Sequence, residues 1–238
     1  MIVQRLLFLA ALLAVGFAVN LAGRFKRTHA PVYGWWTLSF LFYAAAFLME
    51  ALTVNGNWQL VWEYQIYMVA SAGLVGTMSV GTVYLALPRS RIPFFYGLYV
   101  ALATISLALF AVLHPPVLQG SWLSLNAGKN AIVGPSQISY LLLSAVGGPV
   151  VVLGALWSWW KVRRYYTLLI GVGALVPSLA GTFASQGLGE SWFPVFNIVG
   201  LILIFLGYVY SRPRTRVVEL RKSPLGRSDG RERRGKVI

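Results

Sequence analysis

The chain has 238 residues, of which 58% are hydrophobic and only 11% are charged. The apolar residues gather in runs of roughly 18 or more, which are rare in soluble domains of this size and typical of membrane-spanning helices. The absence of cysteine excludes disulfides, thiolate metal sites and a cysteine nucleophile. The sequence therefore predicts an all-α integral membrane protein.

Seven apolar segments, each close to the length that a helix needs to cross the hydrocarbon core, follow one another along the chain. They run from Ile2 to Ala22, Trp35 to Thr53, Leu60 to Leu87, Phe94 to Leu113, Ile138 to Trp160, Tyr166 to Ser185 and Phe193 to Tyr210. The prediction is a seven-transmembrane-helix bundle over residues 1–211, followed by a basic tail over residues 212–238.

The first segment also resembles a secretory signal peptide, because Arg5 precedes a leucine-rich stretch. Two features favour a retained helix instead. No small residues form a good cleavage site between Asn20 and Gly23, and the basic residues that follow, Arg24 to Arg27, would have to be translocated if the segment were removed.

The net charge of +14 is distributed as in membrane proteins rather than as in nucleic-acid-binding domains. Ten of the twenty basic residues lie between Arg212 and Lys236. Eight more lie in the connections after the first, third and fifth segments: Arg24, Lys26, Arg27, Arg89, Arg91, Lys161, Arg163 and Arg164. Because basic residues collect on the cytoplasmic side, we expect the N-terminus outside, the C-terminus in the cytoplasm and the plasma membrane as the location.

The tail has many charges and few apolar residues, so we expect it to be disordered when alone. Its first basic residues are placed to contact anionic lipid headgroups; they are Arg212, Arg214, Arg216, Arg221 and Lys222. Two interpretations of the tail remain: it only fixes the orientation of the chain in the membrane, or it is a regulatory or partner-binding segment.

The one long connection, His114 to Gln137, is expected to fold back over the mouth of the bundle.

Small residues and internal prolines suggest how the helices pack. Small residues four or seven positions apart allow close approach of helices in lipid, either inside the bundle or along a homodimer seam. The candidates are Gly73, Thr77 and Gly81 at four-residue spacing, and Gly147 with Gly154 and Gly200 with Gly207 at seven-residue spacing. Pro149 and Pro177 each remove a backbone hydrogen bond inside a segment and predict a kink, which serves packing or forms part of a substrate path.

Charged residues at membrane depth suggest a site near the outer ends of the first three segments. Glu50 and Glu63 flank one short turn, and Arg5 is the basic residue expected at the same depth, so we predict an ion pair of Arg5 with one of the two. Aromatic residues are expected to line the same cavity: Trp58, Trp62 and Tyr64. The alternative is that these are independent interfacial charges.

The sequence contains no concentrated set of nucleophile, base or metal ligands, which disfavours an enzyme, and we expect no cofactor and no metal site. None of the five lysines lies inside an expected helix, so a retinal Schiff base has no attachment point. We therefore expect a non-enzymatic sensor, ligand-binding or assembly protein whose ligand is unidentified and whose partner is a membrane protein or a second copy of the chain. The alternative is a small transporter or lipid-handling protein that uses the two proline-containing helices.

Overall fold

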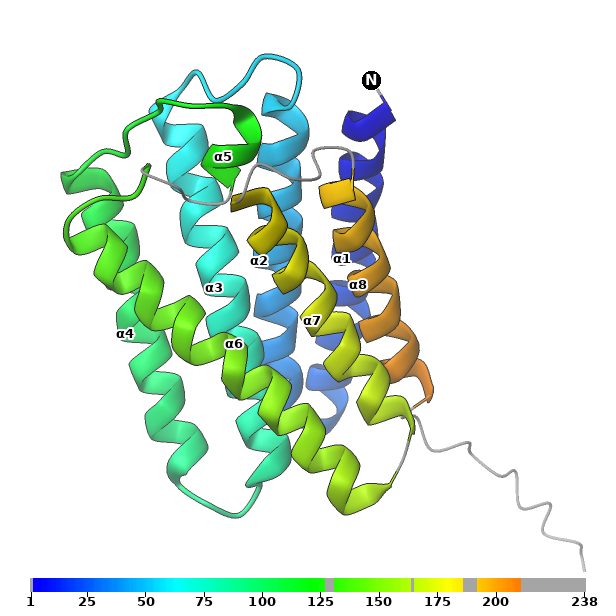
Figure 1. The fold of residues 1–238 in the computed structure, drawn as a ribbon. Coiled ribbons are helices and arrows are strands. Elements are labelled where there is room, and N and C mark those ends of the chain that lie inside the picture. Colours follow the sequence, from blue (N-terminus) through cyan, green and yellow to red (C-terminus); the bar gives the residue numbers. More distant parts are fainter. Residues whose placement is uncertain (1, 127–130, 164, 186–191, 211–238) are drawn as a thin grey trace, which may run out of the picture.

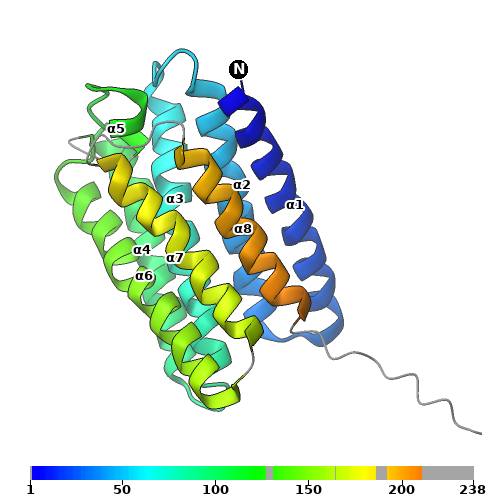
Figure 2. The same ribbon diagram turned by 45° about the vertical axis from the view of Figure 1, so that its right-hand side comes forward.

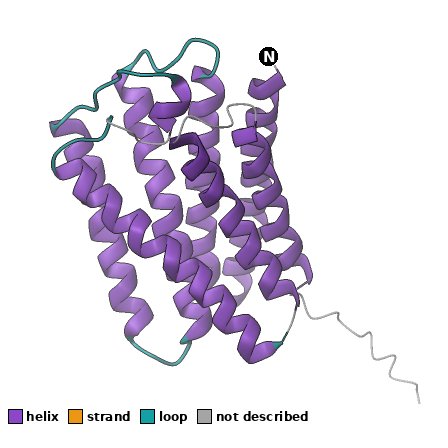
Figure 3. Ribbon diagram, in the orientation of Figure 1, coloured by secondary structure: helices purple, strands orange, loops and turns teal. Residues whose placement is uncertain are grey.

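A computed structural model of the chain describes residues 2–126, 131–163, 165–185 and 192–210. In these ranges the regular structure is entirely helical, with short loops between the helices (Figure 3). The seven long helices are α1 (Ile2–Thr28), α2 (Pro31–Thr53), α3 (Val61–Ala86), α4 (Ile92–Leu113), α6 (Pro135–Val162), α7 (Tyr165–Ser185) and α8 (Trp192–Tyr210). A short helix, α5 (Trp122–Asn126), lies in the long connection between α4 and α6.

Each apolar segment predicted from the sequence is a helix, and the largest difference in length is at the end of α1. This helix continues past Ala22 to Thr28, through the basic residues that the sequence placed in a loop. Basic side chains in the last turn of a helix interact favourably with its dipole, which here favours Lys26 and Arg27. The Thr28 hydroxyl also donates a 2.9 Å hydrogen bond to the Arg24 carbonyl. Pro31 then starts α2, where a missing N–H costs nothing.

Six of the described helices are long and apolar enough to cross a membrane: α1, α2, α3, α4, α6 and α8. In α7 the apolar part is shorter and covers Leu168–Pro177. The chain is therefore an all-helical membrane protein with a bundle architecture.

Helix α3 lies at the centre of this bundle, with α2, α4 and α6 around it (Figures 1 and 2). In its apolar window 67% of the residues are buried, compared with 28% for α4 and for α6. Helix α1 packs on α2 and α8 and so lies at the side of the bundle. Side chains that line a cavity of this protein are therefore expected on α3 and on the faces of its neighbours.

Glycines allow close helix contacts inside the bundle. A Cβ atom on Gly147 of α6 would lie 3.1 Å from the carbonyl oxygen of Val75 in α3. On α8, a Cβ atom at Gly200 would lie 2.6 Å from the carbonyl oxygen of Gly173 and 2.5 Å from the ring of Pro177. The predicted small-residue contacts are therefore present within one chain.

The two internal prolines lie inside helices that continue beyond them, Pro149 in α6 and Pro177 in α7. The predicted bend at each proline stays a prediction. The basic tail residues Arg212 to Lys222 and the external lysine, Lys129, lie outside the described residues.

The three short connections α1–α2, α3–α4 and α6–α7 lie at one end of the bundle, away from the N-terminus (Figure 1). At this end Arg24 donates a 3.2 Å hydrogen bond to the Tyr33 hydroxyl, and its guanidinium lies 5.1 Å from the Tyr208 ring centroid. At the opposite end, here called the N-terminal end, lie the α2–α3 turn and α5.

Candidate functional site

The turn between α2 and α3 forms one side of the site. Asn57 adopts a left-handed backbone conformation with φ of 62°, which asparagine tolerates better than most residues. Its side-chain amide donates to the Gly120 carbonyl at 2.9 Å, and its Oδ1 accepts from the Trp58 backbone N–H at 2.9 Å. These bonds connect the turn to the long α4–α6 connection and direct Trp58 into the protein, where only 4% of its surface is exposed.

Three aromatic residues then form a cluster under this turn. The Trp58 ring lies 5.1 Å from the Tyr64 ring in an edge-to-face arrangement and 5.0 Å from the Tyr67 ring, measured between centroids. Tyr64 and Tyr67 are both buried and follow one another on one side of the first turns of α3. The three side chains of this cluster carry three polar groups, one indole N–H and two phenol hydroxyls.

Each of these polar groups binds α5. The Tyr64 hydroxyl donates to the Leu125 carbonyl at 2.7 Å, and the Tyr67 hydroxyl donates to the Asn126 carbonyl at 2.7 Å. The Trp58 indole N–H donates to Oδ1 of Asn126 at 2.8 Å. The long connection therefore folds back over the N-terminal end of the bundle, as the sequence predicted (Figure 1).

A polar cavity with a volume of about 170 Å³ lies beside this cluster. Residues of α2, α3, α5, α7 and α8 line it: Tyr43, Ala46, Phe47, Glu50, Tyr67, Ser71, Leu74, Val75, Asn126, Pro177, Phe193 and Asn197. It is large enough for several water molecules or a small organic ligand. The cavity thus brings together segments that are more than 140 residues apart in the sequence, since 197 − 50 = 147.

Glu50 is the one acidic residue among the described side chains that line this cavity. Only 3% of its surface is exposed, and its Oε2 atom has no hydrogen-bond partner in the part of the chain that the structure describes. The neighbouring hydroxyl of Tyr67 has a single proton, which it donates to the Asn126 carbonyl. A buried carboxyl without a cation or a full set of donors is costly, so this side chain is not placed for stability.

Asn126 contributes a second unpartnered group to the same cavity. Its Nδ2 atom is buried and has no hydrogen-bond partner among the described residues. The Trp58 N–H can only donate, so it must face the oxygen of the Asn126 amide and leave the NH₂ group free. The site therefore offers one free acceptor, on Glu50, and one free donor, on Asn126.

No protein-family model, curated protein or solved structure matches this chain.

Two smaller cavities continue from the polar cavity toward the opposite end of the bundle. The middle cavity, of about 70 Å³, shares four lining residues with the polar cavity, namely Tyr43, Leu74, Val75 and Pro177.

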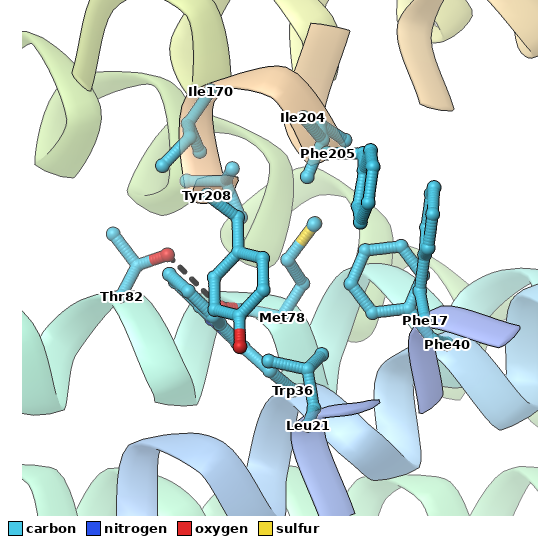
Figure 4. Close-up of a pocket in the computed structure, with 11 residues that line it drawn as sticks. Phe17, Leu21, Trp36, Phe40, Met78, Thr82, Ile170, Ile204, Phe205 and Tyr208 are labelled. Carbon is cyan, nitrogen blue, oxygen red and sulfur yellow. Dashed lines mark hydrogen bonds between the residues drawn. The ribbon is translucent and has the colours of Figure 1, made fainter. Parts of the chain in front are cut away.

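The apolar cavity comes next and shares Met78, Val151 and Ile204 with the middle cavity. Its volume is about 20 Å³, which is close to the space of one water molecule. Figure 4 shows how side chains fill this region, with the Phe17 ring stacked on Phe205 at 4.0 Å between centroids. The volumes of the three cavities therefore decrease from the N-terminal end toward the opposite end, where apolar side chains close the series.

The structure separates most of the residues that the sequence grouped into one site. Glu50 faces the polar cavity, whereas Arg5 is exposed on α1 and Glu63 is half-buried in the first turn of α3. Among the described residues Arg5 forms no ion pair with either carboxylate. Trp58 and Tyr64 belong to the aromatic cluster, but 51% of the Trp62 surface is exposed and this residue lines a separate groove with α4.

Other residues of the cavity were not predicted from the sequence. Tyr43 and Tyr67 look like ordinary aromatic residues of membrane helices, and Asn126 looks like a polar loop residue. Asn197 carried a usable signal, because an asparagine inside a strongly apolar segment is costly unless it faces other protein groups. In the structure it is buried and donates to the Phe193 carbonyl at 2.8 Å.

Proposed function

We propose that this chain is a membrane-embedded ligand-binding protein of the sensor or receptor class, and that the polar cavity is its binding site. The observation that carries the proposal is the buried Glu50 carboxyl, which lines a cavity of about 170 Å³ and has one oxygen without a hydrogen-bond partner among the described residues. Intramembrane ionisable groups are expensive and are usually kept for binding or transport. The free amide of Asn126 supports the same interpretation, because a ligand would satisfy both groups at once.

The proposal includes a topology. We propose that α7 crosses the membrane with the other long helices, that the N-terminus is outside and that the membrane is the plasma membrane. The support is the charge distribution. Basic residues at the end of α1 (Arg24, Lys26 and Arg27), in the α3–α4 connection (Arg89 and Arg91) and after α6 (Arg163) share one end of the bundle, which the positive-inside rule places in the cytoplasm. The polar cavity then faces the extracellular side, and its ligand comes from outside the cell.

This topology is tested with single cysteines, which are informative because the chain has none. Exposed residues at the two ends are Gln119, in the α4–α6 connection, and Ser90, in the α3–α4 connection. In intact cells an impermeant thiol reagent is expected to label Gln119→Cys and to label Ser90→Cys only after the membrane is permeabilised. Labelling of Ser90→Cys alone in intact cells would reverse the orientation.

A carrier is the second candidate, and one observation favours it. The three cavities share lining residues in series, and the middle one is lined by Pro177 of α7 and by Gly148, next to Pro149 of α6. These positions can bend without a large cost, so the path could open in another conformation. In this structure the path of a carrier would be closed, because the apolar cavity has room for only about one water molecule.

Binding is tested by thermal unfolding of the purified protein in mild detergent against a library of small polar compounds. A ligand at 100 times its Kd stabilises a protein by about 2.7 kcal/mol. We expect at least one compound to stabilise the wild type and to lose this effect in Glu50→Gln. If every compound acts equally on both proteins, the polar cavity is not the binding site.

Uptake of the same compound into proteoliposomes then separates the two candidates. Binding without accumulation supports a sensor or receptor, and saturable accumulation that is lost in Glu50→Gln supports a carrier. Sealed liposomes without protein give the background rate.

A further inference from the structure

We propose that the ligand of the polar cavity is a small organic cation, an amine or ammonium compound that also carries a hydrogen-bond acceptor. This inference rests on the proposed binding function and adds the chemical class of the ligand. Three independent features of the described cavity support it: its charge, its aromatic lining and the orientation of one amide.

The charge of the cavity is unbalanced. Glu50 lines it, but none of the other described lining residues is Lys, Arg or His. Arg5, the nearest candidate from the sequence, is exposed on α1 instead. A carboxylate taken out of water is stabilised mainly by a counter-charge with good hydrogen-bond geometry. A protonated amine on the ligand supplies both the charge and an N–H donor for Oε2 of Glu50, which has no partner in the described ranges, whereas a quaternary ammonium group supplies the charge alone.

Aromatic rings on two helices surround this carboxyl. Tyr43 and Phe47 lie on the same face of α2 as Glu50, and their rings pack edge to face with centroids 4.6 Å apart. Tyr67 lies on the facing helix α3. Cations bind favourably over the faces of such rings, and the gain is larger where water is excluded. Anionic ligands gain nothing from these faces and are repelled by Glu50.

The Asn126 amide specifies the other end of the ligand. The Trp58 indole N–H holds its oxygen at 2.8 Å, so the NH₂ group is left as a donor for the cavity. Tyr67 connects the two groups, because its hydroxyl binds the Asn126 backbone and its side chain lines the same cavity as Glu50. A hydroxyl, carbonyl or carboxylate oxygen on the ligand, a few bonds from the cationic nitrogen, is the complement of this donor.

The volume limits the size of the ligand. An engineered apolar cavity of about 150 Å³ holds one benzene molecule, and this cavity has about 170 Å³. The ligand therefore has on the order of six to ten non-hydrogen atoms. Amino alcohols, amino acids and small quaternary ammonium alcohols fall in this range.

The test is a binding panel on the full-length protein in detergent, measured by isothermal titration and by thermal unfolding. The panel contains amino alcohols, zwitterionic amino acids and choline, their neutral diol counterparts, carboxylates of the same size, and sodium and potassium chloride. We expect saturable binding in the first group only. Glu50→Gln removes the charge and the hydrogen bond to it, so this variant should bind the first group roughly tenfold more weakly or worse.

Glu63→Gln is the matched control, since it removes a carboxylate from the half-buried first turn of α3, outside the residues that line the cavity. It is expected to change the affinity less than twofold. Asn126→Leu should weaken amino alcohols more than tetramethylammonium, which has no acceptor.

The outcomes separate this inference from the proposed function. Binding of neutral or anionic compounds that is unaffected by Glu50→Gln overturns the cationic class but leaves a ligand-binding protein. Binding of sodium or potassium with no organic cation also overturns it and assigns an inorganic ion to Glu50. If no compound of the panel or of the wider library binds, both the inference and the proposed function are wrong.

Discussion

Replacement of Glu50 by methionine is expected to stabilise the ligand-free protein, by about 1–3 kcal/mol in the free energy of unfolding, while it removes ligand binding. The reason is that the carboxyl is buried and one of its oxygens has no partner among the described residues. Methionine fills a similar volume without a polar group and adapts to irregular surroundings. Most substitutions of buried residues destabilise, so a gain in stability here would mark a residue kept for function.

The measurement is thermal or denaturant unfolding in neutral detergent, with Glu63→Met as the control. Glu63 is half-buried in the first turn of α3, where its interaction with the helix dipole is worth only tenths of a kcal/mol. We therefore expect its replacement to change stability by no more than about 0.5 kcal/mol. A clear loss of stability in Glu50→Met would show that the carboxyl stabilises the fold, and the binding proposal would lose its basis.

The second large effect is expected from Trp58→Ala, with a loss of about 3–5 kcal/mol. This change removes a side chain that is 4% exposed, two ring contacts with Tyr64 and Tyr67, and the hydrogen bond to Asn126. The cavity left behind lies directly under α5. Helix α5 should therefore detach from the bundle before the long helices unfold.

Trp62→Ala is the matched control, because this tryptophan is four residues further along the chain and has 51% of its surface exposed. Limited proteolysis of the α4–α6 connection and near-ultraviolet circular dichroism report on α5 and on the aromatic cluster. Faster cleavage in Trp58→Ala than in Trp62→Ala is the expected result. Equal cleavage of the two variants would mean that the cluster does not hold α5.

The long helices could be predicted because the physics that determines them is local. A segment of about 20 apolar residues has to satisfy its own backbone hydrogen bonds in lipid, and only a helix does so. Prolines at the start of α2 and α6 and basic residues at the end of α1 mark the boundaries in the sequence itself. The remaining differences, such as the extension of α1 to Thr28, concern interfacial turns where polar residues are compatible with both helix and loop.

The site could be predicted only in part, because its geometry depends on how helices face one another. The sequence identifies Glu50 from its depth in the membrane. Two nearby carboxylates require a cation, and this requirement favours Arg5. In the structure Glu50 and Glu63 point to different surroundings, so the repulsion that required a cation between them is absent. Other polar residues that line the cavity, Asn126 and Asn197, come from α5 and α8, which no periodicity of α2 could reveal.

The central position of α3 has a mechanical consequence. Tyr67 and Ser71 line the polar cavity, and Thr82, about four turns along the same helix, lines the apolar cavity. Two contacts along this helix are close, since the Val75 backbone lies against Gly147 and the Thr82 side chain against Gly154. Close-packed contacts transmit displacement. We therefore expect a displacement at Tyr67 to move α3 as a unit and to reach the basic α3–α4 connection at Arg89, at the other end of the bundle.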